Sequence, residues 1–416
     1  MKVSVIIPCY NMKIYLAECL NSILSQSLKD IEIVCIDDGS NDGTKELLED
    51  FQDKYDNIRI TSQSNKGSGS ARNKGMELAQ GEFVAFMDAD DFYPDTDILE
   101  YLYETALRQV ANICGGSFCS YRNGVYTFNG FRKGMVFNKD GWINSKEFPT
   151  FTGYWRFLFR KSFLFENNIV FPDYLRGQDC PFFVNALSKA EKIYCLKKVT
   201  YCYRKEHKVV KFDLKKAVDF IQTIKDCLII AKENGLNRIY EALVDELNGE
   251  PIALMYHFAH EGSLEMRRLI HDINLLVSDN NDRNTRFLED AELDKHLEMA
   301  MSDRERFFSK IDAYSKILVY GAGTVGRKVL SFLRSYHYEP EAFIVSDLKQ
   351  NPTNVEGVDV KSIEDYISIR NDCFVIVATF PYLNEEIREV LDRKKFTEYY
   401  LLDLEKFYLW CGEIIH

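Results

Sequence analysis

The chain opens with Val3-Ser4-Val5-Ile6-Ile7-Pro8, an apolar run closed by proline, which begins the pattern that decides the fold. The run predicts a buried strand, and apolar residues at helical spacing predict a helix over 15–28. The alternation continues, with strands expected at 31–36, 58–60 and 83–87 and helices at 44–55 and 70–79. Such alternation indicates an α/β fold with a parallel sheet and right-handed crossovers.

Polar side chains follow three of the expected strands. They are Tyr10 and Asn11 after the first strand, Asp37 and Asp38 after the second, and Asp88, Asp90 and Asp91 after the fourth. Parallel sheets bind ligands outside the carboxyl ends of their strands, so these residues predict one site. Carboxylates two residues apart can together reach a hard divalent cation that bridges a diphosphate. In an alternative that stays open, Asp88 and Asp91 cap the turn and helix near Pro94.

Composition and charge narrow the class of protein. The 416 residues suffice for two or three domains, and 46% hydrophobic with 28% charged residues is typical of globular proteins. The net charge of -12 disfavours nucleic acid as a partner. The 11 cysteines lack metal-ligand spacing and are expected as reduced thiols of a cytoplasmic protein. We expect neither a signal peptide nor an apolar run of the roughly 18 residues that span a membrane, so membrane contact would be peripheral.

Four motifs in series resemble the family 2 inverting glycosyltransferases. They are the stretches 5–11 (VIIPCYN), 34–44 (VCIDDGSNDGT), 65–75 (NKGSGSARNKG) and 87–91 (MDADD). The resemblance is strong over residues 1–100 and weaker over 101–205. It implies the A-type glycosyltransferase fold with its nucleotide-binding sheet, which we expect as a catalytic domain over residues 1–211.

The resemblance also implies roles for individual residues. Those expected to bind the donor nucleotide are Pro8, Tyr10, Asn11, Asp38, Arg72 and Asp88. The Tyr10 ring would lie against the base, Asp38 would accept a hydrogen bond from a uracil-type ring, and Arg72 would face the phosphates. Asp90 and Asp88 would hold Mn²⁺ or Mg²⁺. Asp37 is equally well explained as a turn residue that supports the loop.

The expected catalytic base is Asp179. Inverting transfer needs one carboxylate that deprotonates the acceptor hydroxyl on the face opposite the leaving diphosphate. The stretch 175–183 (LRGQDCPFF) is similar to the family's Glu-Asp motif, although Gln178 replaces the glutamate. The structural alternative makes Asp179 the N-cap of a helix over 181–190, and the two roles are compatible.

Two other features of the middle segment have open interpretations. Aromatic residues gather over 121–148, where a role in the core is favoured over stacking on sugars. Lysines are dense over 192–216, and this cluster would attract phosphate or an anionic membrane surface, although a solvated face is the commoner explanation. Within it, Arg204 follows Tyr201-Cys202-Tyr203, and the resemblance implies contact with a phosphate or the acceptor.

The rest of the chain is expected to form two further parts. Residues 212–312 predict a helical segment, with helices at 217–233, 238–261, 263–277 and 290–311. Residues 313–416 resemble the small Rossmann-like domains of sugar-modifying enzymes, and the candidate nucleotide-binding residues there are Gly321, Gly323, Gly326 and Asp347. A working site, a degenerate site kept for packing, and a docking or homo-oligomerisation module stay open, with the non-catalytic roles favoured.

These observations predict a metal-dependent inverting glycosyltransferase of bacterial polysaccharide biosynthesis. It would move a hexosyl or N-acetylhexosaminyl group from a UDP-sugar to a glycan, lipid-linked or protein-linked acceptor, in the cytoplasm or at the inner face of the membrane. Two alternatives stay open. The glycine turn of the last segment favours an NAD(P)-dependent sugar-nucleotide oxidoreductase, and the Gln178 departure favours a non-catalytic scaffold of a glycan-assembly complex.

Overall fold

The computed structural model describes residues 1–122, 124–128, 135–205, 212–277, 290–348, 351–379 and 383–411. These residues form two compact units, the first of 1–247 with 272–277 and the second of 248–271 with 290–411. The first unit therefore takes in helices that the sequence analysis assigned to a segment beginning at residue 212. The expected domain bounds, 1–211, 212–312 and 313–416, stay a prediction.

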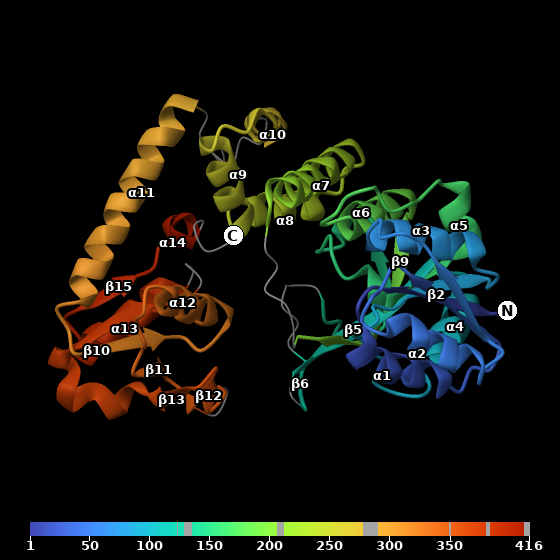
Figure 1. The fold of residues 1–416 in the computed structure, drawn as a ribbon, viewed down its shortest axis with the longest axis horizontal. Helices are drawn as coiled ribbons and strands as arrows, with labels where there is room; N and C mark the ends of the chain where they lie inside the picture. Colours follow the sequence, from blue (N-terminus) through green and yellow to red (C-terminus); the bar gives the residue numbers. More distant parts are fainter. Residues whose placement is uncertain are drawn as a thin grey trace. The chain divides into compact units, whose positions relative to one another are not determined.

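One large mixed sheet organises the first unit (Figure 1). Its strands lie in the order β3-β2-β1-β4-β8-β5-β9-β7, with β6 beside β5. Their bounds are β1 (Val3–Cys9), β2 (Ile31–Asp37), β3 (Ile58–Ser62), β4 (Phe83–Phe86), β5 (Ile113–Arg122), β6 (Val125–Thr127), β7 (Gly141–Asn144), β8 (Phe157–Arg160) and β9 (Lys192–Arg204). The first four strands are parallel, as expected, whereas β8 runs antiparallel to β4 and β5.

Helices connect the parallel strands, which confirms the expected alternation. They are α1 (Lys13–Leu24), α2 (Thr44–Gln52), α3 (Ser68–Leu78) and α4 (Ile98–Arg108), and α5 (Lys161–Glu166) and α6 (Asp179–Lys189) follow later. Helix α3 packs so closely on β1 that a Cβ atom at Gly75 would lie only 2.3 Å from Ile6 Cγ2, which leaves room for glycine only. Helix α1 ends at Leu24, four residues before the expected end. The apolar pattern runs on to Leu28 because Leu28 is buried even though it lies outside the helix.

The aromatic residues of the middle segment divide between core and surface. Phe148 is fully buried, in agreement with the favoured core role. That role is wrong for Tyr126, Phe128 and Trp142, whose exposed fractions are 47%, 54% and 37%, because β6 and β7 lie at the margin of the sheet. Phe131 lies outside the described residues.

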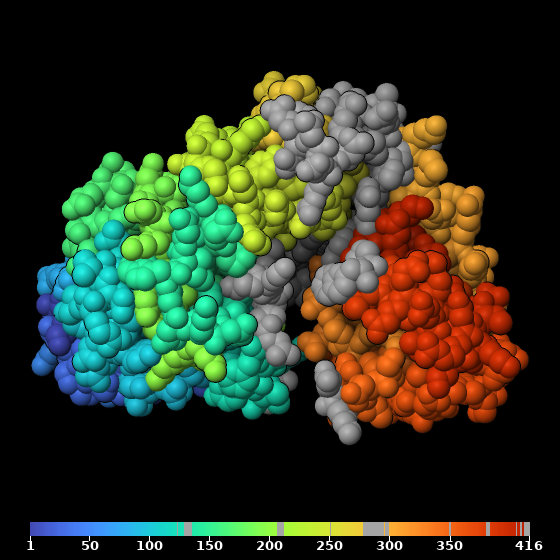
Figure 2. All heavy atoms as spheres, turned by 180° about the vertical axis from the view of Figure 1, so that it is seen from behind, coloured from blue at the N-terminus to red at the C-terminus, as the bar shows by residue number. Residues whose placement is uncertain are grey.

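Two helices of the expected helical segment pack on the first unit. Helix α7 (Leu214–Glu233) lies against α6, and α8 (Asn237–Leu247) lies against α7 and the short helix η1 (Ser145–Glu147). Figure 2 shows the yellow-green surface of this segment continuous with the green surface of the residues before it. The helical segment therefore helps to build the unit that carries the predicted site.

The single helix expected over 238–261 is wrong. The chain leaves α8 at Leu247 and begins α9 (Glu250–His260) after Gly249, whose backbone is not helical. Pro251 lies in the first turn of α9, where its missing N–H has no intrahelical partner to lose. The apolar pattern continues through both helices because α8 buries one face and α9 is buried over most of residues 251–259, so apolar periodicity does not show the break.

A second, smaller sheet organises the second unit, as expected. Its strands lie in the order β12-β13-β11-β10-β14-β15, and all pairs except β12–β13 are parallel. Their bounds are β10 (Lys316–Tyr320), β11 (Ala342–Val345), β12 (Asn354–Val355), β13 (Val358–Ser362), β14 (Cys373–Val377) and β15 (Tyr399–Leu401). Besides α9, its helices are α11 (Asp290–Ile311), α12 (Thr324–Ser335), α13 (Asn384–Arg393) and α14 (Leu404–Cys411), with the 3-10 helix η4 (Ile363–Asp372). Helix α10 (Leu264–Val277) belongs to this unit up to residue 271 and to the first unit from residue 272.

Candidate functional site

The loops after β1 and β2 are tied to each other by side-chain hydrogen bonds. Asn11 has a left-handed backbone with φ of 54°, which an asparagine tolerates. Its N–H donates to Ser40 Oγ at 3.1 Å, and its Oδ1 accepts from the Asn41 N–H at 2.9 Å. Next to it Tyr10 is 41% exposed, so its ring is accessible to a ligand. Asn11 therefore shapes the loops that flank Tyr10.

The two aspartates after β2 are both buried and serve the local backbone. Asp37 accepts from the Ser40 N–H at 3.1 Å, as the turn interpretation expects. Asp38 accepts from Gln63 Nε2 at 2.8 Å, from the Lys66 N–H at 2.9 Å and from the Gly67 N–H at 2.8 Å. Asp38 thus anchors the loop that leads into α3, and its contact with a uracil ring stays a prediction.

An acidic cluster lies at the end of β4. Asp88, Asp90 and Asp91 each offer a carboxylate oxygen, and these oxygens lie within 4.8 Å of one another. Three oxygen donors at this spacing fit a hard divalent cation such as Mn²⁺ or Mg²⁺. Asp88 and Asp90 are half-buried, whereas Asp91 is only 2% exposed.

Asp91 does not cap the following helix, so that alternative is wrong for this residue. Its carboxylate accepts from the Tyr201 hydroxyl at 2.6 Å and from the Arg204 N–H at 2.8 Å, both on β9. Burial raises the pKa of Asp91 well above its usual value, as do the charges of Asp90 and Asp88, and the two donors on β9 oppose this rise. An antiparallel bridge between Phe92 and Cys202 brings the turn after β4 to the last residues of β9, which linear sequence does not reveal.

Arg72 lies beside the acidic cluster. Its Nη2 donates to Asp88 Oδ1 at 2.6 Å, and its Nη1 donates to Ser68 Oγ at 3.2 Å. The guanidinium is buried against the ring faces of Tyr154 and Phe171. Among the described residues its Nε has no hydrogen-bond partner. The resemblance implies that Arg72 faces the donor phosphates. In the structure Arg72 contacts Asp88, which belongs to the same predicted site.

Asp179 begins α6 close to this arginine. The cap position belongs to Gln178, so the helix starts before the expected residue 181. Burial raises the pKa of Asp179, while the positive charges of Arg72 and Arg176 lower it. A raised pKa suits a general base, because proton transfer is most efficient when the pKa approaches the working pH. Gln178, which replaces the family's glutamate, donates through Nε2 to Ser68 Oγ.

The loop before Asp179 is fixed by α7, and sequence reasoning missed the residues that fix it. Asp219 Oδ2 accepts from the Leu175 N–H at 2.9 Å, and Asp226 Oδ2 accepts from the Tyr174 hydroxyl at 2.6 Å. Thr223 Oγ1 donates to the Arg176 carbonyl at 3.3 Å. A signal was present in the sequence, since Asp219 and Thr223 lie four residues apart on a helix face that is otherwise apolar.

Arg204 is not part of a solvated face. It is 7% exposed, and its guanidinium lies over the rings of Tyr15, Phe92 and Tyr121. Its Nε donates to the Asp90 carbonyl at 2.7 Å, and its Nη2 pairs with Glu18. Contact between Arg204 and a phosphate or an acceptor stays a prediction. Residues 206–211 of the lysine-rich stretch lie outside the described residues.

The glycine turn of the second unit is shaped by packing at two of its three glycines. Gly321 has φ of 107°, which favours glycine, and a Cβ at Gly326 would lie 1.9 Å from the Gly321 carbonyl oxygen. At Gly323 an added Cβ would meet nothing within 4 Å. Asp347 is exposed after β11. Nucleotide binding by these residues stays a prediction.

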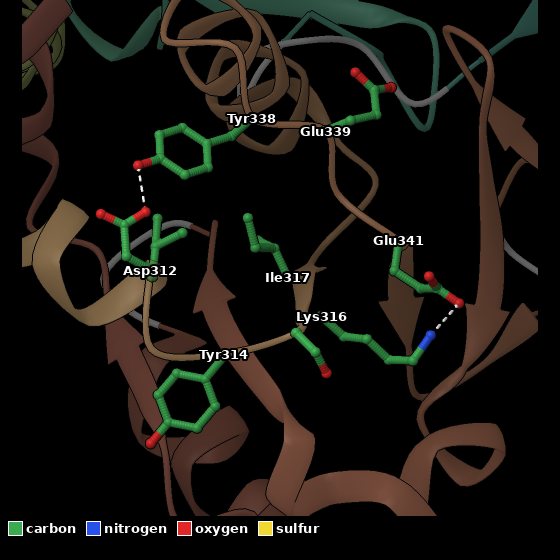
Figure 3. A pocket seen from close by; sticks show the side chains of 9 residues that line it. Asp312, Tyr314, Lys316, Ile317, Tyr338, Glu339 and Glu341 are labelled. Carbon is green, nitrogen blue, oxygen red and sulfur yellow. Dashed lines mark hydrogen bonds and ion pairs between the residues drawn. The ribbon is translucent and has the colours of Figure 1, made fainter.

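A cavity of about 250 Å³ lies where β10 and β11 begin, whereas the glycine turn follows the end of β10 (Figure 3). The Tyr338 hydroxyl donates to Asp312 at 2.6 Å, and Lys316 pairs with Glu341 at 2.9 Å. These two pairs lie within the cavity wall, whereas Glu339 pairs with Arg334, which does not line the cavity. The cavity and the glycine turn are separate features.

All eleven cysteines lie within the described residues and are free thiols, as expected. Among the described residues, no helix combines the length and the apolarity needed to cross a bilayer.

Comparison with known proteins identifies the first part of the chain. Residues 4–164 match the family model described as glycosyl transferase family 2. The uncharacterized glycosyltransferase EpsJ of Bacillus subtilis is 31% identical over 225 residues, which cover 52% of this chain and 65% of that protein. The poly(ribitol-phosphate) beta-glucosyltransferase of Bacillus spizizenii is 33% identical over 211 residues, which cover 49% of this chain and 32% of that protein. The chain thus spans less than two thirds of either relative.

A solved structure shares the fold. S. aureus TarS 1–349 in complex with UDP-GlcNAc superposes with a TM-score of 0.52 at 23% identity, covering 66% of this chain and 80% of that one. The expected A-type fold is thereby confirmed. The motifs, the sheet order and the family match agree, and residues 4–164 of this chain match glycosyl transferase family 2.

Proposed function

We propose that the chain is a metal-dependent inverting glycosyltransferase that moves a sugar from a UDP-sugar donor to an acceptor hydroxyl. One observation carries the proposal: Arg72 pairs with Asp88 at 2.6 Å, and the charges of both residues act on Asp179. The Asp88 carboxylate, the buried Arg72 guanidinium and the candidate base Asp179 thus lie close enough for their charges to interact. TarS, which shares the fold, was solved with UDP-GlcNAc, and this supports a UDP-sugar as donor.

The chemistry assigns a separate task to each carboxylate. Asp179 would accept the proton of the acceptor hydroxyl while that oxygen bonds to the anomeric carbon of the sugar. The bond from this carbon to the diphosphate oxygen breaks on the opposite face, so the configuration inverts and UDP leaves with the electron pair. A divalent cation held by Asp88 and Asp90 would neutralise the charge of the departing diphosphate.

The acceptor is proposed only as a hydroxyl-bearing glycan, lipid-linked or protein-linked molecule. The relatives differ in this respect, because one is named a poly(ribitol-phosphate) beta-glucosyltransferase and another a cholesterol galactosyltransferase of Borreliella burgdorferi. We also propose a place in polysaccharide biosynthesis, because one relative is named as acting on poly(ribitol-phosphate). Peripheral membrane contact and oligomerisation through the last 100 or so residues are kept as predictions.

The test is release of nucleoside diphosphate from a panel of UDP- and GDP-sugars with Mn²⁺. We expect release from one UDP-sugar and its loss in Asp90→Ala. The matched control is Asp95→Ala, which removes an exposed carboxylate from the same loop and should keep the wild-type rate. Release from a UDP-sugar that Asp90→Ala leaves unchanged would contradict the assigned metal site. If no donor reacts, calorimetric titration with UDP separates an enzyme that needs its acceptor from a scaffold that binds no nucleotide.

The oxidoreductase alternative has one observation in its favour. In chain order the strands β13-β11-β10-β14-β15 read 3-2-1-4-5, which is the order of dinucleotide-binding sheets. Titration of the full chain with NADH and NADPH tests it, with Gly323→Val as the blocking variant because that position has open space around it. Binding that Gly323→Val removes would support this alternative, and no binding by the wild type would reject it.

A further inference from the structure

The turn after β4 is attached to β9 through a buried carboxylate. The Asp91 side chain is 2% exposed, and one oxygen accepts from the Tyr201 hydroxyl while the other accepts from the Arg204 N–H. The Asp91 N–H also donates to the Asp88 carbonyl at 3.0 Å, which closes the turn. Asp91 therefore joins the acidic turn to a strand that lies more than a hundred residues further along the chain.

The same two residues of β9 hold the backbone of the other aspartates. The Tyr201 hydroxyl accepts from the Asp88 N–H at 3.2 Å, so it bridges Asp88 and Asp91. Arg204 Nε donates to the Asp90 carbonyl at 2.7 Å. Each aspartate of the acidic cluster is thus hydrogen-bonded to Tyr201 or Arg204, and for Asp88 and Asp90 these bonds leave the carboxylates to other partners.

Tyr201 and Arg204 are themselves fixed by their surroundings. The Tyr201 ring is fully buried, and its centroid lies 4.3 Å from that of Trp155. The Arg204 guanidinium lies 5.1 Å from the Tyr15 ring centroid, and its Nη2 pairs with Glu18 on α1. Side chains held on several sides can transmit a fixed geometry to the backbone they contact.

We propose that Tyr201 and Arg204 are positioning residues of the cation site. Together they fix the Asp88–Asp91 turn so that the carboxylates of Asp88 and Asp90 are held at the spacing a divalent cation requires, with Asp91 as the anchor. The inference rests on the proposed function, because it takes Asp88 and Asp90 as cation ligands. It gives Arg204 a role in shaping the turn in place of direct contact with the leaving phosphate.

The expected size of the effect follows from other metal sites. Residues that orient metal ligands typically change metal affinity by about 10- to 100-fold when they are replaced. Tyr201→Phe keeps the buried ring and removes only the hydroxyl that bridges Asp88 and Asp91. We therefore expect UDP affinity in the presence of Mn²⁺ to fall by about 10-fold and the half-activating Mn²⁺ concentration to rise by a similar factor. UDP affinity in EDTA should stay at the wild-type value.

Calorimetric titration with UDP, once in Mn²⁺ and once in EDTA, measures both affinities on the full chain. The matched control is Tyr103→Phe, which removes a hydroxyl bonded to Glu82 at 3.2 Å at the other end of β4. Both variants should keep the circular dichroism of the wild type. If Tyr201→Phe matches Tyr103→Phe in Mn²⁺ dependence, the positioning role is overturned.

Arg204→Lys and Glu18→Gln distinguish positioning from phosphate contact. Lysine keeps the charge but cannot span the Asp90 carbonyl and Glu18 as a guanidinium does. If Arg204 positions the turn, both variants weaken Mn²⁺-dependent UDP binding and leave binding in EDTA intact. If Arg204→Lys weakens binding in EDTA while Glu18→Gln has no effect, Arg204 contacts the phosphate and our inference is wrong.

Failure of the proposed function gives a different result. If UDP binding and turnover of the wild type do not respond to Mn²⁺, the metal-dependent reaction and this inference are both overturned. If the wild type responds and Tyr201→Phe responds equally, only the inference is overturned.

Discussion

The two units contain the same local device, a parallel strand that ends in a turn before a helix, yet they differ in what surrounds it. In the first unit the turn after β4 carries carboxylates bonded to Arg72 and to β9. In the second unit the turn after β10 is explained at Gly321 and Gly326 by backbone packing. Among the described residues, the acidic cluster with metal-ligand spacing lies in the first unit. A shared strand–turn–helix therefore predicts a fold, and only the side chains around it predict chemistry.

The largest expected effect is loss of transfer in Asp179→Asn. The amide cannot accept the acceptor proton, and general bases contribute about 10²- to 10⁴-fold to rate, so kcat should fall by that factor. Calorimetric UDP binding should be unchanged. Asp173→Asn, an exposed aspartate in the preceding loop, is the control. Full transfer by Asp179→Asn would show that this residue is not the base. It would also weaken the contrast between a first unit that carries reactive side chains and a second unit whose turn is explained by packing.

The next largest effect is a loss of stability expected from Gly326→Ala in the second unit. Gly326→Ala would bring a methyl group against the Gly321 carbonyl oxygen, and overpacking of this kind typically costs about 1–3 kcal/mol in the free energy of unfolding. Gly323→Ala meets open space and should change the unfolding temperature little. Thermal unfolding followed by circular dichroism compares the two variants. Equal stability of both would show that packing does not explain Gly326.

A smaller effect is expected where α7 holds the loop of Asp179. Asp219→Ala leaves the partly buried Leu175 N–H without its acceptor, and a hydrogen bond to a charged group contributes about 1.5–3 kcal/mol. We expect the loop to loosen and kcat to fall by about 10-fold, because misplacement of a catalytic group lowers the rate. UDP affinity should be kept. Lys215→Ala, which removes only the exposed partner of Asp219, is the control, and an equal loss of rate in both variants would refute the loop argument.

The smallest effect concerns pH. If Asp179 is the base, as we propose, transfer requires its deprotonated form, so the rate should fall as the pH drops through its pKa, which burial raises above the usual value. The positive charge of Arg176 lowers this pKa, and Arg176→Gln should therefore move the acidic limb to higher pH, by less than about one unit. The pH dependence of kcat measures the limb. A shift to lower pH would contradict the assignment of the base.

Much of the first unit could be predicted because its signals are local. Apolar periodicity located β1 to β4 and their helices, and the polar residues after those strands converge as parallel sheets require. Helix ends were less predictable, since burial of Leu28 extends the apolar pattern past the end of α1. The break between α8 and α9 was missed for the same reason, although Gly249 and Pro251 mark it.

The sequence by itself determined the α/β fold, the resemblance to a family and the identities of the candidate carboxylates, because those depend on short-range patterns. Only the tertiary structure decided that Asp91 is an anchor, that Arg204 is buried beside Asp90, and that Asp219 supports the loop of Asp179. These contacts join residues far apart in the chain, and their partners are chosen by strand order and helix packing. Most buried polar groups are hydrogen-bonded, but which group supplies the bond is a property of the folded molecule.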